Sequence, residues 1–149
     1  GPAALAACGG SGSVMTAGCI TEPDLRVLIV DDNALNIELA GYVLEVGGFV
    51  VEAVSDAAQA LQRLQHDLPD LILMDIQLPG MDGLELTRCL KADDRLRGIV
   101  VVAFTAFAMK GDEQRMRAAG CDGYLAKPID VAHFAGQVRD CWREARART

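Results

Sequence analysis

The chain has 149 residues, of which 51% are hydrophobic and 23% charged, which is enough for one well-buried domain but scarcely for two. Fourteen Lys and Arg against twenty-one Asp and Glu give a formal charge of −7, which argues against a nucleic-acid binder and against attraction to an anionic membrane surface. The longest apolar stretch, Ile99 to Met109, is interrupted by Thr105 and is too short to span a bilayer.

The amino-terminal segment carries no secretory signature. No Lys or Arg precedes Arg26, so the positively charged start of a signal peptide is missing. The cysteines are odd in number, widely spaced and without a CxxC pair, which favours neither a disulfide framework nor a zinc site. They are Cys8, Cys19, Cys89, Cys121 and Cys141. We therefore expect reduced thiols in a cytoplasmic protein.

Residues 1–24 differ from the rest of the chain. Gly, Ala, Ser and Thr dominate up to Thr21 without any periodicity, which predicts a flexible tail. The first two residues, Gly1 and Pro2, look like the remnant of a cleaved expression tag. We expect residues 25–149 to form a single domain.

Short runs of branched apolar residues alternate with longer stretches of helical spacing from Arg26 onward. The predicted strands are Arg26–Val30, Val50–Val54, Leu71–Met74, Ile99–Phe104 and Gly123–Ala126. The predicted helices are Ala34–Val46, Ala57–Gln65, Gly83–Ala92, Gly111–Ala119 and Val131–Ala147. Near-continuous apolar strands indicate burial on both faces, and their alternation with helices indicates right-handed crossovers. The pattern predicts an α/β domain of three layers, a five-stranded parallel sheet with helices on both faces.

The first predicted helix is apolar over much of its circumference. At about 3.6 residues per turn, the positions that can pack on the sheet are Leu39, Ala40, Val43, Leu44 and Gly47. Leu35, Tyr42 and Val46 lie on one flank of this stripe, and Ile37 lies on the other. The apolar arc spans roughly 220°, about twice what one sheet contact requires. Either the core face is broad or a partner protein lies along the helix, and the pattern leaves both open.

Polar side chains stand where the predicted strands end. The first strand is followed by Asp31 and Asp32, the third by Asp75, the fourth by Thr105 and the fifth by Lys127. Ligands of open parallel sheets bind outside the carboxyl ends of the strands, so these residues are candidates for a site. Each also has an ordinary explanation: Asp32 or Asn33 as a helix cap, Asp75 as a turn former, Thr105 as a strand end and Lys127 as a solvated charge. Their common position at one edge favours a functional site.

The chemistry of this cluster is restrictive. Two carboxylates about 5 Å apart repel by roughly 3 kcal/mol at an effective dielectric near 20, so the cluster must hold a proton or a cation. Oxygen ligands without His or Cys select a hard ion, and Mg²⁺ is the usual one where phosphate is handled. Lys127 offers a cation and Thr105 a hydroxyl to anionic oxygens. Together these groups indicate phosphoryl transfer to an aspartate.

Four segments carry a family resemblance. The runs VLIVDDN, LILMDIQLPGMDG, VVAFTAFAMKGD and GCDGYLAKPI resemble the receiver domain of bacterial two-component response regulators, with its CheY-like, flavodoxin-like fold. The resemblance extends from about Arg26 to Trp142. The chain is similar above all to the stand-alone DivK-type regulators, although receivers fused to hybrid histidine kinases carry many of the same motifs.

The resemblance implies a role for each matched residue. Asp75 would be the phosphoacceptor, taking a phosphoryl group from a phosphohistidine on a histidine kinase or a histidine phosphotransfer protein. Asp32 and Asp75 would bind Mg²⁺ directly, with the backbone carbonyl of Gln77 as a third ligand and Asp31 acting mostly through water. Lys127 and Thr105 would contact the phosphoryl oxygens. The protein would act as a phosphoacceptor with at most weak self-dephosphorylation, not as an enzyme.

The resemblance also implies a switch. Tyr124 stands at the position of the switch aromatic and would turn inward as Thr105 moves toward the phosphate, altering the face made by the fourth helix, fifth strand and fifth helix. The alternative is a half-buried strand aromatic with its hydroxyl in water. The bond between Lys127 and Pro128 would be cis. Phe107, on the approach of hydrolytic water, would slow loss of the phosphoryl group.

Output is expected through protein contacts. Only a few residues follow the last predicted helix, and the arginines from Arg139 to Arg148 alternate with acidic residues, which favours a solvated helix face. We expect a kinase to dock on the first helix and the corner after the fifth strand. The residues expected to contact it are Asn36, Ile37, Leu39, Pro128 and Ile129. We expect a monomer or a phosphorylation-dependent dimer, a downstream protein target, and neither direct nucleic-acid binding nor membrane binding.

Three other interpretations compete. A haloacid dehalogenase-type phosphatase would need a second acid two residues after Asp75, where Gln77 stands. A flavodoxin-like redox module would need a phosphate-cradling loop after the first strand, where Asp31 and Asp32 would repel a phosphate. A receiver excised from a longer hybrid kinase would keep the same chemistry, and the pattern does not exclude it.

Overall fold

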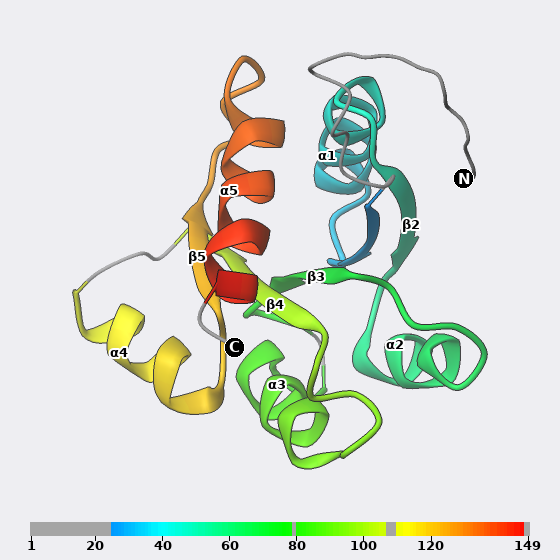
Figure 1. Ribbon diagram of the computed structural model, residues 1–149, viewed down its shortest axis with the longest axis vertical. Helices are drawn as coiled ribbons and strands as arrows, with labels where there is room; N and C mark the ends of the chain where they lie inside the picture. The colour runs from blue at the N-terminus through cyan, green and yellow to red at the C-terminus, as the bar shows by residue number, and fades with distance from the viewer. Residues whose placement is uncertain (1–24, 79, 107–109, 148–149) are drawn as a thin grey trace, which may run out of the picture.

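The computed structural model describes residues 25–78, 80–106 and 110–147, and the predicted tail over residues 1–24 lies outside them. Strands and helices alternate along the described chain (Figure 1). The strands are β1 (Arg26–Val30), β2 (Val50–Val54), β3 (Leu71–Asp75), β4 (Val100–Thr105) and β5 (Gly123–Ala126). The helices are α1 (Ala34–Val46), α2 (Ala57–Leu64), α3 (Gly83–Ala92), α4 (Lys110–Ala119) and α5 (Phe134–Ala147).

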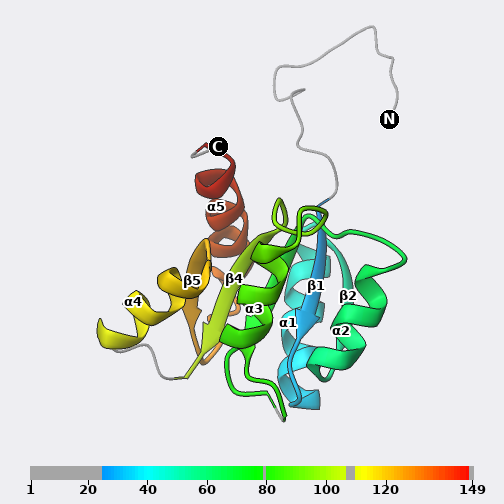
Figure 2. The same cartoon turned by 90° about the horizontal axis from the view of Figure 1, so that it is seen from below.

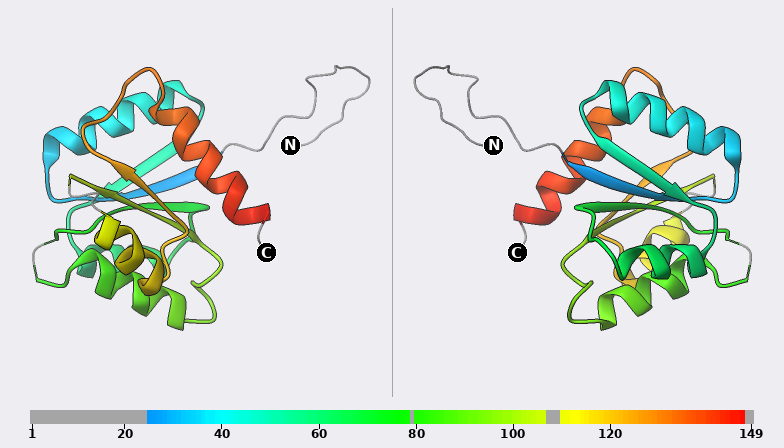
Figure 3. Two further views of the ribbon diagram at one scale, coloured as in Figure 1. Left: turned by 90° about the vertical axis from the view of Figure 1, so that its left-hand side faces the viewer. Right: turned by 90° about the vertical axis from the view of Figure 1, so that its right-hand side faces the viewer.

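The strands form one parallel sheet in the order β2-β1-β3-β4-β5 (Figure 2). Helices α1 and α5 cover one face, and α2, α3 and α4 cover the other (Figure 3). All residues of β3 and β4 are buried, so the continuous apolar runs are covered on both faces as predicted. The predicted fold class is confirmed. The order also brings the carboxyl ends of β1, β3 and β4 side by side.

Three of the helices begin at an Asn or Asp whose side chain accepts hydrogen bonds from the first helical turn. Asn33 accepts from the amides of Leu35 and Asn36, and Asp56 and Asp82 cap α2 and α3 in the same way. Capping satisfies amides that have no partner within the helix. Asn33 rather than Asp32 therefore begins α1, which leaves Asp32 for another role.

Helix α1 buries a narrower stripe than predicted. Its buried side chains are Ala40, Val43 and Leu44. Leu39, expected on the sheet, is 42% exposed, because it lies to one side of the positions that face the strands. It continues an exposed apolar row that also contains Leu35, Tyr42 and Val46.

Helix α5 begins three residues later than predicted. Val131 lies in a turn and is exposed. The Asp130 carboxylate accepts from the Ala132 amide, and the Asp130 carbonyl accepts from the His133 and Phe134 amides. These bonds hold residues 130–133 in a turn, and the helix starts at Phe134.

Arg139 departs from the solvated face predicted for the carboxy-terminal arginines. Its guanidinium lies 4.7 Å from the centroid of the Phe49 ring and donates to the Gly47 carbonyl at 2.9 Å. The charge therefore lies at the carboxyl end of α1, where a cation complements the helix dipole. Arg139 ties α5 to α1.

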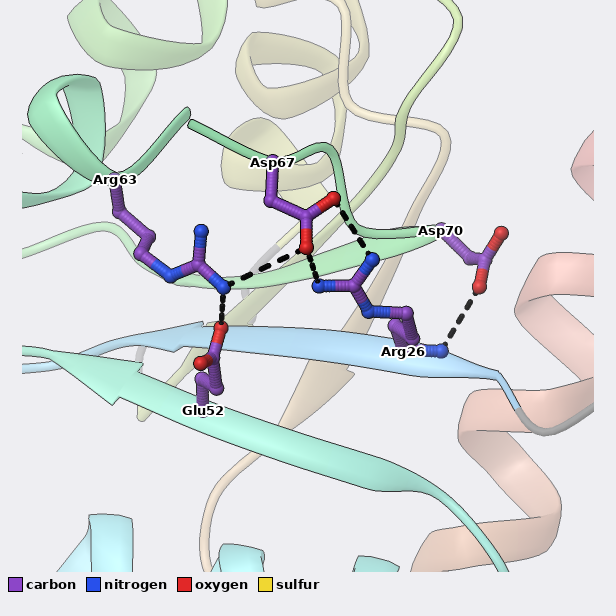
Figure 4. Close-up of polar contacts among 5 residues, drawn as sticks. All are labelled: Arg26, Glu52, Arg63, Asp67 and Asp70. Atoms are coloured by element: carbon purple, nitrogen blue, oxygen red, sulfur yellow. Dashed lines mark hydrogen bonds and ion pairs between the residues drawn. The ribbon is translucent and has the colours of Figure 1, made fainter. Parts of the chain in front are cut away.

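Ion pairs stabilise the sheet at the amino ends of its strands, opposite the carboxyl ends where Asp75 lies (Figure 4). The guanidinium of Arg26 pairs with the Asp67 carboxylate, and the Arg26 amide donates to Asp70 at 2.9 Å. Arg63 on α2 pairs with Glu52 on β2. The network joins β1, β2 and the segment between α2 and β3 at the end remote from Asp75. No helix in the described part of the chain is long and apolar enough to cross a membrane.

Candidate functional site

Three carboxylates meet at the carboxyl edge of the sheet. One oxygen each from Asp31, Asp32 and Asp75 can be chosen so that all lie within 4.8 Å of one another. Asp31 and Asp75 are only 1% and 6% exposed, whereas Asp32 is exposed. The cluster therefore has two buried acids at the ends of the neighbouring strands β1 and β3, and one acid open to solvent.

Local hydrogen bonds fix Asp31. Its amide donates to the Val54 carbonyl at 3.1 Å, which extends the β1–β2 ladder by one residue. Its Oδ1 atom accepts from the Asn33 amide at 2.9 Å. The side chain is thus held by the turn that leads into α1, with Oδ2 left for other contacts.

Asp75 is placed by a close backbone contact. Its Oδ1 atom accepts from the Gln77 amide at 3.0 Å. A Cβ atom added to Gly83 would lie 2.2 Å from the Asp75 carbonyl oxygen and 2.8 Å from Ile76 Cα. Only glycine allows α3 to begin so close to the end of β3. Asp75 Oδ1 therefore stabilises the turn after β3, as an ordinary turn former would, whereas Oδ2 remains available for other contacts.

Lys127 joins the two buried acids. Its Nζ atom lies 3.3 Å from Asp31 Oδ2 and 3.4 Å from Asp75 Oδ2. The same atom stands 5.2 Å from the centroid of the Phe104 ring. The Lys127 side chain is only 17% exposed, so it is not a solvated charge. The bond between Lys127 and Pro128 is cis, as predicted.

The pKa of Asp75 is raised above its usual value. Burial is the largest cause, and the Asp31 charge adds to it. The Gln77 amide and Lys127 act in the opposite direction because they stabilise the carboxylate. The charged form of Asp75 is therefore disfavoured in a chain without a bound cation.

Thr105 and Tyr124 lie on the same side of the site. Thr105 is buried at the end of β4, and its carbonyl accepts from the Lys127 amide at 2.8 Å. Tyr124 is half-buried on β5, and its hydroxyl donates to Glu113 Oε1 on α4 at 2.9 Å. The hydroxyl is thus bound to a carboxylate, in contrast to the solvated alternative.

The donor set fits a hard cation. Asp31 Oδ2 is buried and accepts no hydrogen bond from the residues that the structure describes, although Lys127 stands nearby. An acceptor of this kind costs stability unless a positive charge compensates it. All-oxygen ligands without a thiolate or imidazole are typical of Mg²⁺ sites. Asp31, Asp32 and Asp75 together therefore offer the ligand chemistry of a hard-cation site.

The residues predicted to dock a kinase surround this edge. Asn36 and Ile37 are half-buried in the first turns of α1, and Leu39 is exposed. Pro128 is exposed, and Ile129 is half-buried against the core that α1 and α5 share. Gln77 is exposed beside Asp75. Phe107 lies outside the described residues, so its predicted role rests on the sequence alone.

Sequence reasoning missed three contributors to the site. Gly83 permits the close approach to Asp75, Glu113 binds the Tyr124 hydroxyl, and Phe104 supports Lys127. The Asp82-Gly83 pair at the start of a predicted helix could have indicated Gly83. No local pattern pointed to Glu113 or Phe104, because both contacts depend on how the elements pack.

Comparison with known sequences finds one family over most of the chain. The response regulator receiver domain matches residues 27–139. The polar-differentiation response regulator DivK of Brucella anthropi is 49% identical over 113 residues, which are 76% of this chain and 92% of that protein. DivK of Brucella melitensis is 48% identical over the same length and the same shares.

Comparison with solved structures finds the same fold. A CheY-like receiver domain protein from Methanospirillum hungatei superposes with a TM-score of 0.73 at 28% identity, covering 85% of this chain and 100% of that one. The receiver domain of a histidine kinase from Syntrophus aciditrophicus has a TM-score of 0.72 at 32% identity, covering 80% and 90%.

Proposed function

The chain belongs to the response regulator receiver domain family and is DivK-like, and from this premise we propose that Asp75 accepts a phosphoryl group from a phosphohistidine. The donor is a histidine kinase or a histidine phosphotransfer protein. The observation that carries the proposal is the contact of Lys127 Nζ with both buried acids, 3.3 Å from Asp31 and 3.4 Å from Asp75. This contact puts a nucleophilic carboxylate and a cation at one edge of the sheet.

The proposed step is a displacement at phosphorus. A carboxylate oxygen of Asp75 forms a bond to the phosphorus while the phosphorus–nitrogen bond of the phosphohistidine breaks, and the imidazole nitrogen leaves with the electron pair. Lys127 offsets the negative charge on the phosphoryl oxygens, and the Thr105 hydroxyl donates to one of them. In the product, the buried negative charge at Asp75 has moved onto the phosphoryl oxygens.

Four groups would hold Mg²⁺: the carboxylates of Asp31, Asp32 and Asp75 and the backbone carbonyl of Gln77. The bound ion would supply positive charge that reduces repulsion between the carboxylates and the incoming phosphoryl group. The exposed position of Asp32 and the buried acceptor on Asp31 support this assignment.

Phosphorylation would act on the surface of α4, β5 and α5. Thr105 follows the phosphoryl group, and Tyr124 turns inward into the space that Thr105 leaves, which changes the packing of α4 against β5. The hydrogen bond from Tyr124 to Glu113 supports this account, because it already links the aromatic side chain to α4. The result is a shift between two packings that a downstream protein distinguishes.

The proposal includes a docking site and a cellular context. The kinase or phosphotransfer protein contacts Asn36, Ile37, Leu39, Pro128 and Ile129. The protein acts in the cytoplasm as a monomer or a phosphorylation-dependent dimer, with residues 25–149 as the receiver domain and residues 1–24 as a tail. Self-dephosphorylation is weak. The identity to DivK favours a stand-alone regulator, while the likeness to a kinase receiver keeps an excised receiver as the second candidate.

Phosphotransfer from a panel of radiolabelled histidine kinases tests the proposal. We expect rapid labelling of the chain by a small subset of kinases and loss of labelling in Asp75→Asn. Lys127→Ala should slow labelling without abolishing Mg²⁺ binding. Retained labelling in Asp75→Asn would show another acceptor and overturn the assignment.

A further inference from the structure

Strand β2 forms one edge of the sheet, and its outer side carries backbone groups that have no partner among the residues the structure describes. The amide of Val50 donates to the Leu25 carbonyl of the β1 side at 2.8 Å. Alternate residues of a parallel strand bond to the same neighbour, so the register turns the N–H and C=O groups of Val51 and Ala53 away from β1. These four groups can pair with an added strand.

The usual protection of an edge strand is weak here. Natural edges are commonly guarded by lysine, proline or a bulge, and β2 reads Val-Val-Glu-Ala-Val without any of these. The one charged residue of the strand, Glu52, is engaged by Arg63 on the α2 side of the sheet (Figure 4). The charged side chain of β2 therefore lies on the α2 face, and the backbone edge next to the α1 face is open to pairing with another strand.

An open groove runs between this edge and α1. Ile37, Gly41 and Tyr42 line it from the helix, and Val51 and Ala53 line it from the strand. A Cβ atom on Gly41 would lie 3.8 Å from Val51 Cγ1, so the helix and strand are in close contact at the floor. Tyr42 is 66% exposed, which leaves a large apolar wall facing solvent.

The two elements that line the groove, α1 and β2, carry acidic side chains and no basic ones. From residue 27 to residue 62 the chain contains no Lys, Arg or His. The carboxylates of this stretch are Asp31, Asp32, Glu38, Glu45, Glu52 and Asp56. Glu38 and Glu45 line the groove, are exposed, and form no ion pair with any residue in the described part of the chain. The two are seven helical positions apart, about 10 Å along the axis.

We propose that the β2 edge and this groove together bind an extended basic segment of a partner protein, which adds to the sheet as a strand beside β2. Its backbone pairs with Val51 and Ala53. Its Lys or Arg side chains lay their aliphatic parts on Tyr42 and place their charges at Glu38 and Glu45. This site goes beyond the phosphoryl chemistry and lies along the flank of α1.

Charge favours a basic partner over the two occupants that the chain itself offers. A second copy would bring another set of glutamates and a second net charge of −7 to the same edge. Residues 1–24 of the same chain contain Glu22 and Asp24 but no Lys or Arg. Neither the β2 edge of a second copy nor residues 1–24 contains the cations that the groove requires.

Amide hydrogen exchange of the full chain tests the inference. The probe is an acetylated, amidated heptapeptide in which valine alternates with arginine, and its control carries glutamate in place of arginine. We expect saturation with the arginine peptide to slow exchange of the Val51 and Ala53 amides at least tenfold, and the glutamate peptide to have no effect. Binding that leaves both amides unchanged overturns the inference, as does protection of both amides in the free chain.

Charge variants separate the groove from general attraction. The double change Glu38→Lys and Glu45→Lys should weaken binding of the arginine peptide at least tenfold. The matched double change Glu85→Lys and Glu144→Lys alters the net charge equally at exposed sites on α3 and α5 and should change affinity less than twofold. Equal weakening in both would show that only the overall charge matters and would overturn the inference.

Discussion

Asp75 combines two properties that oppose each other, burial and a full negative charge. Burial raises its pKa, with Asp31 adding to the effect. A raised carboxyl pKa means that the folded chain favours the protonated form, so the stability contribution is complete at low pH and is lost as pH rises through the folded pKa. At neutral pH the ionised side chain therefore makes the fold less stable, a cost typical of functional sites.

Asp75→Asn should stabilise the chain in magnesium-free buffer. The amide keeps the shape of the side chain and removes the buried charge, while Lys127 keeps Asp31 as its partner, so the free energy of unfolding should rise by about 1–2 kcal/mol at pH 7. Urea denaturation measures it. Asp32→Asn, at an exposed position, should change stability by less than about 0.5 kcal/mol. A loss of stability in Asp75→Asn would contradict this account.

Burial of the Cys121 thiol should make the stability of the fold depend on pH over a second, alkaline range. Burial raises the pKa of its thiol from 9.0 to about 11. The folded chain keeps the thiol protonated when the unfolded chain has begun to ionise, so its contribution is present below pH 9 and is lost as pH rises toward 11. The stability difference between the native chain and Cys121→Ala should narrow by about 2 kcal/mol between pH 8 and pH 11. A constant difference would show that the thiol is solvated.

At the scale of elements, the site depends on how closely α3 approaches β3. Gly83 lies against the Asp75 carbonyl, and a side chain there has no space. By contrast, a Cβ atom added to Gly136 on α5 would meet no atom within 4 Å beyond its chain neighbours and the backbone of its own helix, and alanine is preferred in a helix. The two glycines therefore form a matched pair.

Gly83→Ala should lower the free energy of unfolding by about 2 kcal/mol and slow phosphorylation, because overpacking displaces the end of β3. Gly136→Ala should raise it by about 0.5–1 kcal/mol and leave phosphorylation unchanged. Thermal denaturation and labelling with acetyl phosphate measure both. A neutral Gly83→Ala variant would mean that α3 can move away from Asp75 without cost.

The elements also mark the limits of prediction from sequence. Apolar periodicity alone predicts the strands and helices, and the common direction of parallel strands is enough to bring Asp31, Asp75 and Lys127 to one edge. The predicted sheet contact of Leu39 and the predicted solvated position of Arg139 were wrong, because the exposure of each side chain depends on the rotation of a helix against its neighbours. Local spacing determines which residues share a face but not which face meets the core.

For the whole molecule, the carboxylate cluster couples ion binding to stability. A ligand that binds only the folded state stabilises it, and Mg²⁺ at ten times its dissociation constant should add about 1.4 kcal/mol to the free energy of unfolding. Asp32→Asn should remove most of this gain, because Asp32 is one of the two acids expected to bind the ion directly. Denaturation with MgCl₂, against NaCl at equal ionic strength, measures the effect. An identical response in both proteins would place any bound ion elsewhere.

The central claim is that Asp75 carries a transient acyl phosphate. Intact-mass measurement after incubation with acetyl phosphate and Mg²⁺, followed by borohydride reduction and peptide mapping, tests it most directly. The account predicts the added mass of one phosphoryl group, located at Asp75 and absent in Asp75→Asn. An unaltered mass in the native chain, or a phosphoryl group mapped to any other residue, would contradict it.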